Sequence, residues 1–157
     1  MDQVRLRAAE PHEADNITAL ARRSKAHWGY EQEFLDRVQD VLTVRPEQIH
    51  GEQVIVAERG ERLLGYYQLG GTPPDGELVD LFVEPDAIGT GLGRRLWDHA
   101  TSAARKRGFR TLELESDPHA EAFYLHMGAQ RVGEREVDTG RQLPVMRIVL
   151  ANAARGH

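Results

Sequence analysis

Cysteine is absent from the 157-residue sequence, which excludes disulfides, thiolate metal sites and cysteine nucleophiles. Lysine is scarce as well, because Lys25 and Lys106 are its only representatives and every other basic residue is arginine. No apolar run reaches the roughly 20 residues that a membrane-spanning helix needs. The N-terminus also lacks the apolar stretch of a signal peptide. These absences predict a cytoplasmic protein that does not enter the membrane.

The charge balance is mildly acidic. The formal net charge is −5 at pH 7, and no basic run stands out. This pattern argues against nucleic acid as a partner. A chain of 157 residues fits one α/β domain with a sizeable core. We expect that domain to span residues 1–150 and the tail of residues 151–157 to be disordered.

The most informative segment is a glycine-rich run between an apolar strand and an amphipathic helix. Gly89, Gly91 and Gly93 alternate directly after the β-rich residues 78–83 and directly before a helix with Leu92 on its apolar stripe. Glycine permits turns that are closed to other residues and lets the backbone approach a ligand closely. A helix N-terminus adds unpaired N–H groups and a positive dipole end. The segment predicts a cradle for an anion, and a pyrophosphate fits it best.

The spacing of these glycines narrows the choice of cradle. A Walker loop is excluded because it requires Gly-Lys-Ser/Thr, whereas Arg94 follows Gly93 here. The dinucleotide-binding motif Gly-x-Gly-x-x-Gly has one residue more than the Gly-x-Gly-x-Gly of this chain. The run resembles the acyl-CoA loop of the GNAT N-acetyltransferases, Gln/Arg-x-x-Gly-x-Gly/Ala, with Ile88, Gly91 and Gly93 at the defined positions. Ile88 departs from the usual Gln or Arg. A glycine-rich turn without a ligand is the alternative for this loop taken alone.

A second block supports the same resemblance. Residues 117–128 are similar to the GNAT segment Asn-x-x-Ala-x-x-Phe/Leu-Tyr-x-x-x-Gly-Phe, with Asp117 in place of Asn. Asp117 suits a helix N-cap and Gly128 the position after the helix. The helical period predicts that one face packs in the core and that Tyr124 lies beside it; that face holds Ala120, Phe123 and Met127.

The order of the remaining elements agrees with the GNAT fold. That fold is α/β, with a mixed, mostly antiparallel sheet of six to seven strands flanked by about four helices. We expect a second helix at residues 31–42 that buries Val41, a loop at residues 70–76 and a central strand at residues 78–83. The other expected strands are residues 3–7, 53–58, 62–69, 111–115, 130–137 and 145–150, and the other helices are residues 11–25, a helix from Leu92 that Gly108 ends, and the Tyr124 helix.

The resemblance implies an acetyl-CoA-dependent N-acetyltransferase with acetyl-CoA as co-substrate and no metal. Transfer would be direct, to a primary amine of a small molecule or of an exposed peptide or protein. Arg94 and Arg95 are candidates for phosphate contacts, with solvated charges as the alternative. The implied cofactor-binding residues are Leu81, Phe82, Val83, Ile88, Gly89, Thr90, Gly91, Leu92, Gly93, Arg94, Asp117 and Tyr124.

The catalytic roles follow from the resemblance in the same way. Tyr124 matches the family's general acid for the leaving thiolate. Glu77 stands at the start of the central strand, where family members often place a carboxylate base, and Asp80 is its competitor. Three positions along a strand, Asp80 should face the other side unless a bulge intervenes. A water relay of the proton is compatible with either carboxylate.

The acceptor should lie over the N-terminal helices. Trp28 and Tyr30 are candidates for an aromatic wall around an ammonium group, with packing of Trp28 in the core as the alternative. His119 and His126 lack a matching carboxylate cluster, which argues against a metal site. A non-catalytic acyl-CoA sensor and a longer acyl donor such as succinyl-CoA stay open. GNAT domains often form homodimers, so the oligomeric state stays open too.

Overall fold

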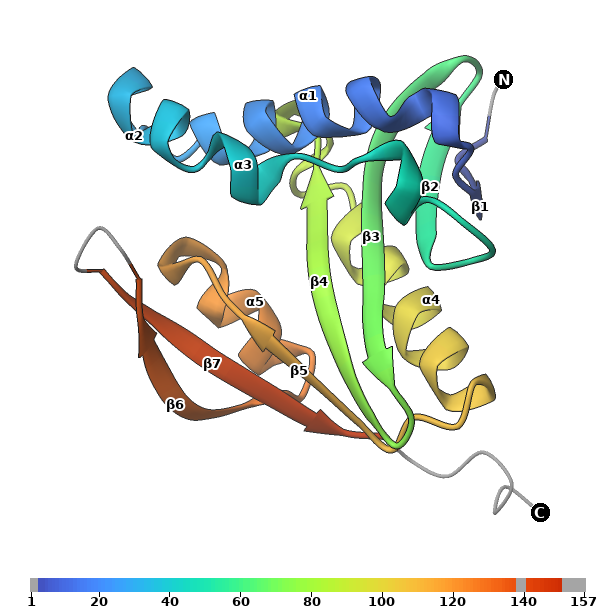
Figure 1. Ribbon diagram of the computed structural model, residues 1–157, viewed down its shortest axis with the longest axis vertical. Coiled ribbons are helices and arrows are strands. Elements are labelled where there is room, and N and C mark those ends of the chain that lie inside the picture. The colour runs from blue at the N-terminus through green and yellow to red at the C-terminus, as the bar shows by residue number, and fades with distance from the viewer. Residues whose placement is uncertain (1–2, 138–140, 151–157) are drawn as a thin grey trace. The chain divides into compact units, whose positions relative to one another are not determined.

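The computed structural model describes residues 3–137 and 141–150. The tail expected to be disordered, residues 151–157, lies outside the described residues. Seven strands form one sheet in the order β1-β2-β3-β4-β5-β7-β6 (Figure 1). All described pairings are antiparallel except the parallel pair β4–β5. No helix in the described part of the chain is long and apolar enough to cross a membrane.

The elements follow the predicted order with few changes. The strands are β1 Arg5–Ala8, β2 Val54–Arg59, β3 Arg62–Thr72, β4 Asp75–Val83, β5 Thr111–Glu115, β6 Gln130–Glu136 and β7 Gln142–Val149. The α-helices are α1 Ala14–Ala26, α2 Gln32–Arg37, α3 Gln39–Leu42, α4 Leu92–Lys106 and α5 Glu121–His126. Short 3-10 turns are η1 Pro11–Glu13, η2 Pro46–Gln48, η3 Pro85–Ala87 and η4 Pro118–Ala120.

The chain folds as two compact units. In its described residues the first unit comprises residues 3–68 and 80–96, and the second comprises residues 69–79, 97–137 and 141–150. The boundaries fall inside β3, β4 and α4, so each of these elements contributes to both units. The two units are described separately below.

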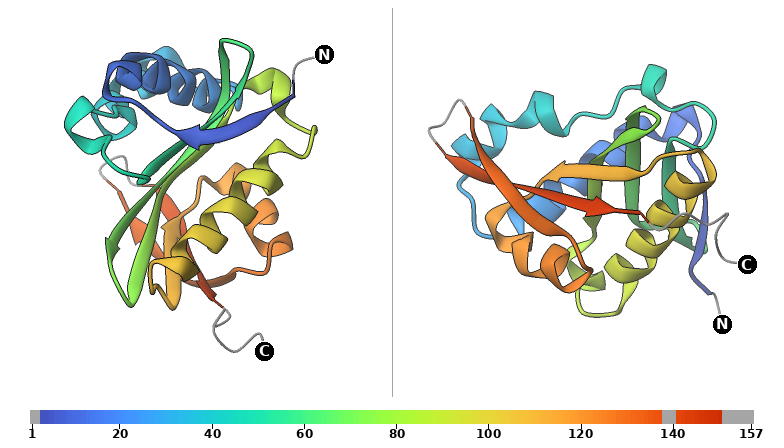
Figure 2. Two further views of the ribbon diagram at one scale, coloured as in Figure 1. Left: turned by 90° about the vertical axis from the view of Figure 1, so that its right-hand side faces the viewer. Right: turned by 90° about the horizontal axis from the view of Figure 1, so that it is seen from below.

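The core of the first unit lies between α1 and one face of β2 and β3 (Figures 1 and 2). Val56 and Tyr66 are register partners on that face and are completely buried, as are Ile17 and Leu20 of α1. At the start of α1, the side chain of Glu13 accepts the N–H of Glu10 at 3.0 Å. This contact satisfies a main-chain donor at the start of the 3-10 turn Pro11–Glu13.

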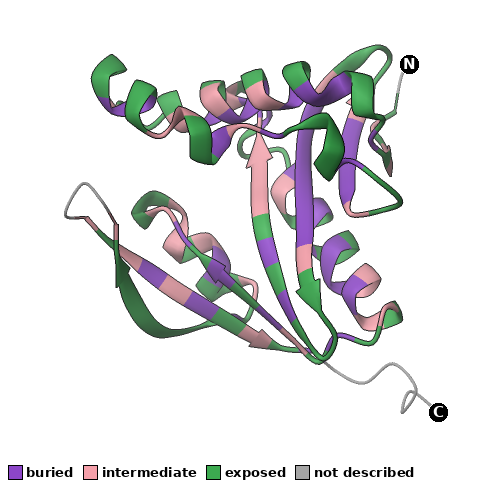
Figure 3. Ribbon diagram, viewed as in Figure 1, coloured by how far each residue is buried: buried purple, intermediate pink, exposed green. Residues whose placement is uncertain are grey.

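In the second unit, buried residues alternate with more exposed ones along β5 and β7 (Figure 3). Leu112 and Leu114 of β5 are buried, as are Ala100 and Ala104 of α4, whereas β6 is exposed along its length. Leu92 and Leu96 of the same helix are buried as well, so the apolar stripe expected from Leu92 onward is confirmed.

Three local predictions were wrong. The loop expected at residues 70–76 is a hairpin, because β3 runs to Thr72, β4 starts at Asp75 and only Pro73 and Pro74 separate them. Pairing with neighbouring strands extends the sheet into a segment whose Gly and Pro content is typical of a loop. The expected helix of residues 31–42 is divided at Val38 into α2 and α3, which leaves Val41 79% exposed.

The third error concerns the Tyr124 helix. Tyr124 is its buried residue, whereas the predicted core residues Ala120, Phe123 and Met127 are half-buried. The α-helical part has only six residues, Glu121–His126, after a 3-10 turn. The 3-10 turn has about three residues per turn instead of 3.6. A prediction that assumes one continuous α-helix therefore assigns the wrong residues to the buried face.

Candidate active site

The glycine loop, residues 88–91, connects η3 to α4 in the first unit. Gly89 and Gly91 have φ angles of +83° and +88°, a left-handed region that favours glycine. A Cβ at either position would meet no atom within 4 Å. The space above the loop backbone is therefore open to a ligand.

The loop leaves a row of main-chain donors unpaired. The first main-chain bond of the helix joins the Arg95 N–H to the Gly91 carbonyl at 3.1 Å. Among the described residues, no hydrogen bond uses the preceding amides, those of Gly89, Gly91, Leu92, Gly93 and Arg94. Unpaired N–H groups at the start of a 15-residue helix combine with its dipole to attract an anion.

The side chains of the loop and of the first turn of α4 differ in exposure. Leu92 is buried, while Ile88 is 40% exposed and both Arg94 and Arg95 are exposed. Thr90 turns back onto the loop, because its Oγ1 donates to the Ala87 carbonyl at 2.5 Å. Both arginines are accessible, so phosphate contacts and solvated charges both stay open as their roles.

Strand β4 leads into the loop. Leu81, Phe82 and Val83 are half-buried, and Phe82 packs against the core of the first unit. The described register of β4 with β5 covers Asp75 to Glu77, while β4 continues to Val83.

The turn after β4 holds a buried carboxylate that the sequence reading missed. Glu84 is 4% exposed and accepts hydrogen bonds from Arg23 of α1, with Nε to Oε1 at 3.0 Å and Nη2 to Oε2 at 2.5 Å. The neighbouring carboxylate raises the pKa of Arg23. A charged residue between an apolar strand and Pro85 is a weak signal that the position is buried and paired.

The aromatic segment, residues 27–30, follows α1 in the first unit. Trp28 is 38% exposed, so the alternative of a core tryptophan is wrong. Its ring contacts His27 edge-on at 5.0 Å between centroids. Tyr30 stacks on Phe34 at 4.5 Å, and the Lys25 ammonium group lies 5.4 Å from the centroid of the Tyr30 ring.

Tyr124 belongs to the second unit and is 7% exposed. Its ring packs against Trp97 at 5.7 Å and against Phe123 at 5.1 Å between centroids. Neighbouring rings therefore fix the orientation of the phenol.

Asp117 begins the turn that leads to Tyr124. Its Oδ1 accepts the His119 N–H at 2.8 Å and lies 2.8 Å from His119 Nδ1, which confirms the predicted N-cap. Its Oδ2 is 3.8 Å from a guanidinium nitrogen of Arg141. The Asp117 side chain thus has a structural role in this turn.

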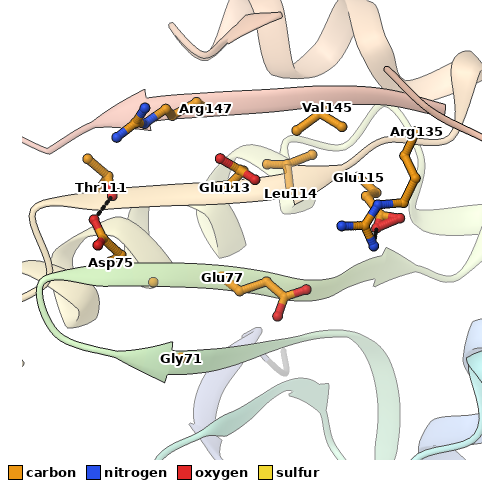
Figure 4. A pocket seen from close by; sticks show the side chains of 11 residues that line it. Gly71, Asp75, Glu77, Thr111, Glu113, Leu114, Glu115, Arg135, Val145 and Arg147 are labelled. Carbon is orange, nitrogen blue, oxygen red and sulfur yellow. Dashed lines mark hydrogen bonds and ion pairs between the residues drawn. The ribbon is translucent and has the colours of Figure 1, made fainter. Parts of the chain in front are cut away.

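Glu77 lies in an acidic pocket on the exposed sheet face of the second unit (Figure 4). The pocket has a volume of about 560 Å³. Glu77 and Glu113 are register partners on β4 and β5, and Arg147 of β7 is the next partner of Glu113. The other charged lining residues are Asp75, Glu115 and Arg135.

Some charged residues of the pocket have a partner, whereas two of its carboxylates are neighbours of the same charge. Arg135 is 3.2 Å from Glu115, and Thr111 donates to Asp75 at 3.1 Å. Glu77 and Glu113 project from neighbouring strands on the same face. The sequence reading found Glu77 but missed the other carboxylates, because strand register decides which of them share a face.

The structure thus groups the predicted residues in two sets. The first unit holds the glycine loop, the end of β4 and the aromatic segment; the second holds Glu77, Asp117 and Tyr124. Among the described residues, no three His, Asp or Glu side chains are arranged to hold a metal ion.

This sheet order, with a glycine loop between β4 and α4, defines an acetyltransferase fold. The structure of the PaiA N-acetyltransferase from Thermoplasma acidophilum in complex with coenzyme A superposes with a TM-score of 0.77 at 17% identity, over 94% of this chain and 99% of that one. The ribosomal-protein-S18-alanine N-acetyltransferase of Escherichia coli gives a TM-score of 0.71 at 19% identity, over 99% of both chains.

Sequence comparison identifies the family. The acetyltransferase (GNAT) domain matches residues 11–150, so the chain belongs to the GNAT family and is an N-acetyltransferase. The peptidyl-lysine N-acetyltransferase YjaB of Salmonella typhimurium is 29% identical over 153 residues, which cover 93% of this chain and 97% of that protein. YjaB of Escherichia coli is 32% identical over 125 residues, which cover 79% of this chain and 77% of that protein.

Proposed function

We propose that the chain uses acetyl-CoA to acetylate a primary amine, with the lysine side chain of a peptide or protein as the acceptor. The observation that carries the proposal is the set of unpaired amides in the glycine loop and the first turn of α4, those of Gly89, Gly91, Leu92, Gly93 and Arg94. Such a set, at the start of a long helix, suits the pyrophosphate of coenzyme A. The solved relative with bound coenzyme A supports this choice of anion.

The proposed chemistry assigns one task to each group of residues. Acetyl-CoA supplies the acetyl group as a thioester. A main-chain N–H among Leu81–Val83 donates to the thioester carbonyl oxygen, where negative charge develops. Glu77 takes a proton from the acceptor ammonium group, directly or through water, so that the nitrogen lone pair can form the new C–N bond. As the C–S bond breaks, the Tyr124 hydroxyl gives its proton to the leaving sulfur, and the second proton lost by the new amide nitrogen returns through water to the phenolate.

The choice of a cationic acceptor rests on the acidic pocket. Glu77 and Glu113 are register partners that line the same pocket, where their negative charge would attract an ammonium group. The aromatic segment also suits a cation, since the Lys25 ammonium group lies 5.4 Å from the Tyr30 ring centroid and Trp28 of the same segment is 38% exposed. Two relatives named peptidyl-lysine N-acetyltransferases support lysine as the acceptor.

Calorimetric titration with acetyl-CoA tests the proposal. We expect micromolar binding by the wild type and none by Gly91→Glu, which places bulk and negative charge beside the unpaired amides. Gly51→Glu is the matched control, because Gly51 also has a positive φ, +59°, and open space around a Cβ. Equal affinity of a folded Gly91→Glu protein would contradict the assignment of the loop.

The acceptor requires a separate assay. Release of coenzyme A should accelerate with a peptide that carries one lysine and remain at background with the same peptide carrying arginine instead. Turnover only with small free amines would contradict the assignment of a peptide acceptor and leave the acetyl-CoA assignment intact.

A further inference from the structure

We infer that Arg23 is a positioning residue that holds both the glycine loop and the aromatic segment. The inference rests on the proposed function, in which the loop binds acetyl-CoA and the aromatic segment contacts the acceptor. All the residues that carry it belong to the first unit.

The side chain of Arg23 fixes the start of the loop through Glu84. The Glu84 carboxylate is buried, and a guanidinium group that contacts both its oxygens allows one orientation. The Glu84 N–H also donates to the Leu64 carbonyl of β3 at 2.8 Å. The backbone that enters the loop is thus attached to α1 and to the sheet at a single residue.

A short chain of hydrogen bonds continues from Glu84 into the loop. The Ala87 N–H donates to the Glu84 carbonyl at 2.9 Å. Thr90 then donates twice to the Ala87 carbonyl, from its N–H at 3.3 Å and from Oγ1 at 2.5 Å. Thr90 stands between Gly89 and Gly91, whose amides are unpaired. The orientation of these donors therefore depends on Glu84, and through it on Arg23.

The main chain of Arg23 fixes the start of the aromatic segment. Its carbonyl accepts the His27 N–H at 3.1 Å, which ends α1. His27 in turn contacts the Trp28 ring. Arg23 is thus bonded to the first residue of the aromatic segment and to the residue before η3. A ligand that orders the loop should therefore also order the aromatic segment, and the two affinities should be coupled.

Calorimetry on Glu84→Gln tests the first half of the inference. Gln keeps the shape of the side chain but loses the charge, and we expect the Kd for acetyl-CoA to rise about tenfold. Asp86→Asn is the matched control: Asp86 lies two positions away and pairs with Arg62 at 2.9 Å, but both side chains are more than half exposed. Its Kd should change by less than about twofold. Equal Kd values for Glu84→Gln and the wild type would overturn the inference.

Arg23→Lys tests the coupling between the two ligands. Lysine keeps the charge and the main-chain bond but cannot contact both carboxylate oxygens. In the wild type, a saturating lysine peptide should lower the Kd for coenzyme A about fivefold or more, and in Arg23→Lys this factor should fall towards one. A purely structural role would lower the melting temperature and leave the coupling factor unchanged, which would overturn the inference. Failure of the wild type to bind acetyl-CoA would instead reject the proposed function.

Discussion

The hydroxyl of Tyr66 on β3 donates a hydrogen bond of 3.1 Å to Oδ2 of Asp80 on β4. Tyr66 is completely buried, and burial, followed by the charge of Asp80, raises its pKa well above the usual 10.0. Asp80 is half-buried. The Tyr66 ring also packs against Phe82, with 6.0 Å between the ring centroids. The competitor of Glu77 as catalytic base is therefore engaged with a buried phenol.

The Tyr66–Asp80 bond predicts a loss of stability in alkali. Because the folded state raises the Tyr66 pKa, its contribution is complete below about pH 10 and is lost as the pH rises towards the folded-state value. Urea unfolding of Tyr66→Phe at pH 7 and near pH 11 should show a smaller decrease in the free energy of unfolding than the wild type shows. An equal decrease would contradict the assignment of the effect to Tyr66.

Substitution of Glu77 should separate the two candidate bases. We expect Glu77→Gln to lower kcat/KM about 100-fold. Glu113→Gln, on the register partner of Glu77, is the matched control and should affect mainly the KM of the acceptor. If Asp80→Asn loses kcat/KM by this factor and Glu77→Gln keeps the wild-type value, the roles must be exchanged.

Tyr124→Phe should reduce kcat by about 100-fold without changing the Kd for acetyl-CoA. The ring contacts with Trp97 and Phe123 are retained in this variant, so the melting temperature should change little. Single-turnover kinetics together with calorimetry would measure both quantities. Undiminished turnover would show that the thiolate leaves without this hydroxyl.

Trp28→Ala should raise the KM of the acceptor about tenfold, because an exposed aromatic face is lost. Trp28 is 38% exposed and does not belong to the buried core, so the melting temperature is measured alongside KM. Val41→Ala on the exposed side of α3 is a control for nonspecific surface effects. A lower melting temperature with an unchanged KM would assign Trp28 a structural role.

The pairing of Arg7 predicts how stability depends on acid. Arg7 donates to Glu13 at 2.9 and 2.8 Å and to Glu58 at 3.0 Å, and these bonds lower the pKa of both carboxylates below the usual 4.5. Their contribution is present above about pH 4.5 and is lost as the pH falls through the folded-state values.

Arg7→Gln should therefore be destabilised by about 2 kcal/mol at pH 7, and its stability should vary less between pH 5 and pH 3. Arg5→Gln is the control, because the Arg5 side chain is 71% exposed and pairs with Glu58 alone. Denaturant titrations at the two pH values would test both variants. The same acid dependence in Arg7→Gln and wild type would reject this account.

Local signals explain what could be predicted from the sequence. The positive φ angles of Gly89 and Gly91, and the buried stripe of α4, depend on residues close together in the chain. The Gly70–Gly76 segment was misread because its strand character depends on pairing with neighbouring strands. In the same way, the short helix around Tyr124 gave too few turns for its period to identify the buried face.

Long-range pairs explain what could not be predicted. Arg23 and Glu84 are 61 positions apart, and neither residue alone indicates its partner. The acidic pocket depends on the register that places Glu77 beside Glu113. Trp28 differs from these pairs: a large aromatic side chain is often buried, but in the turn after α1 it is 38% exposed.

The position of Lys25 against the Tyr30 ring of the aromatic segment has a practical consequence. With just two lysines in the chain, an amine-reactive label modifies few sites, and each can be followed by mass spectrometry. The Lys25 ammonium group lies over the Tyr30 ring, whereas Lys106 is exposed in the last turn of α4. Under the proposed function, acceptor binding at the aromatic segment should lower the labelling rate of Lys25 relative to that of Lys106, so the ratio of the two rates would report binding without an engineered probe.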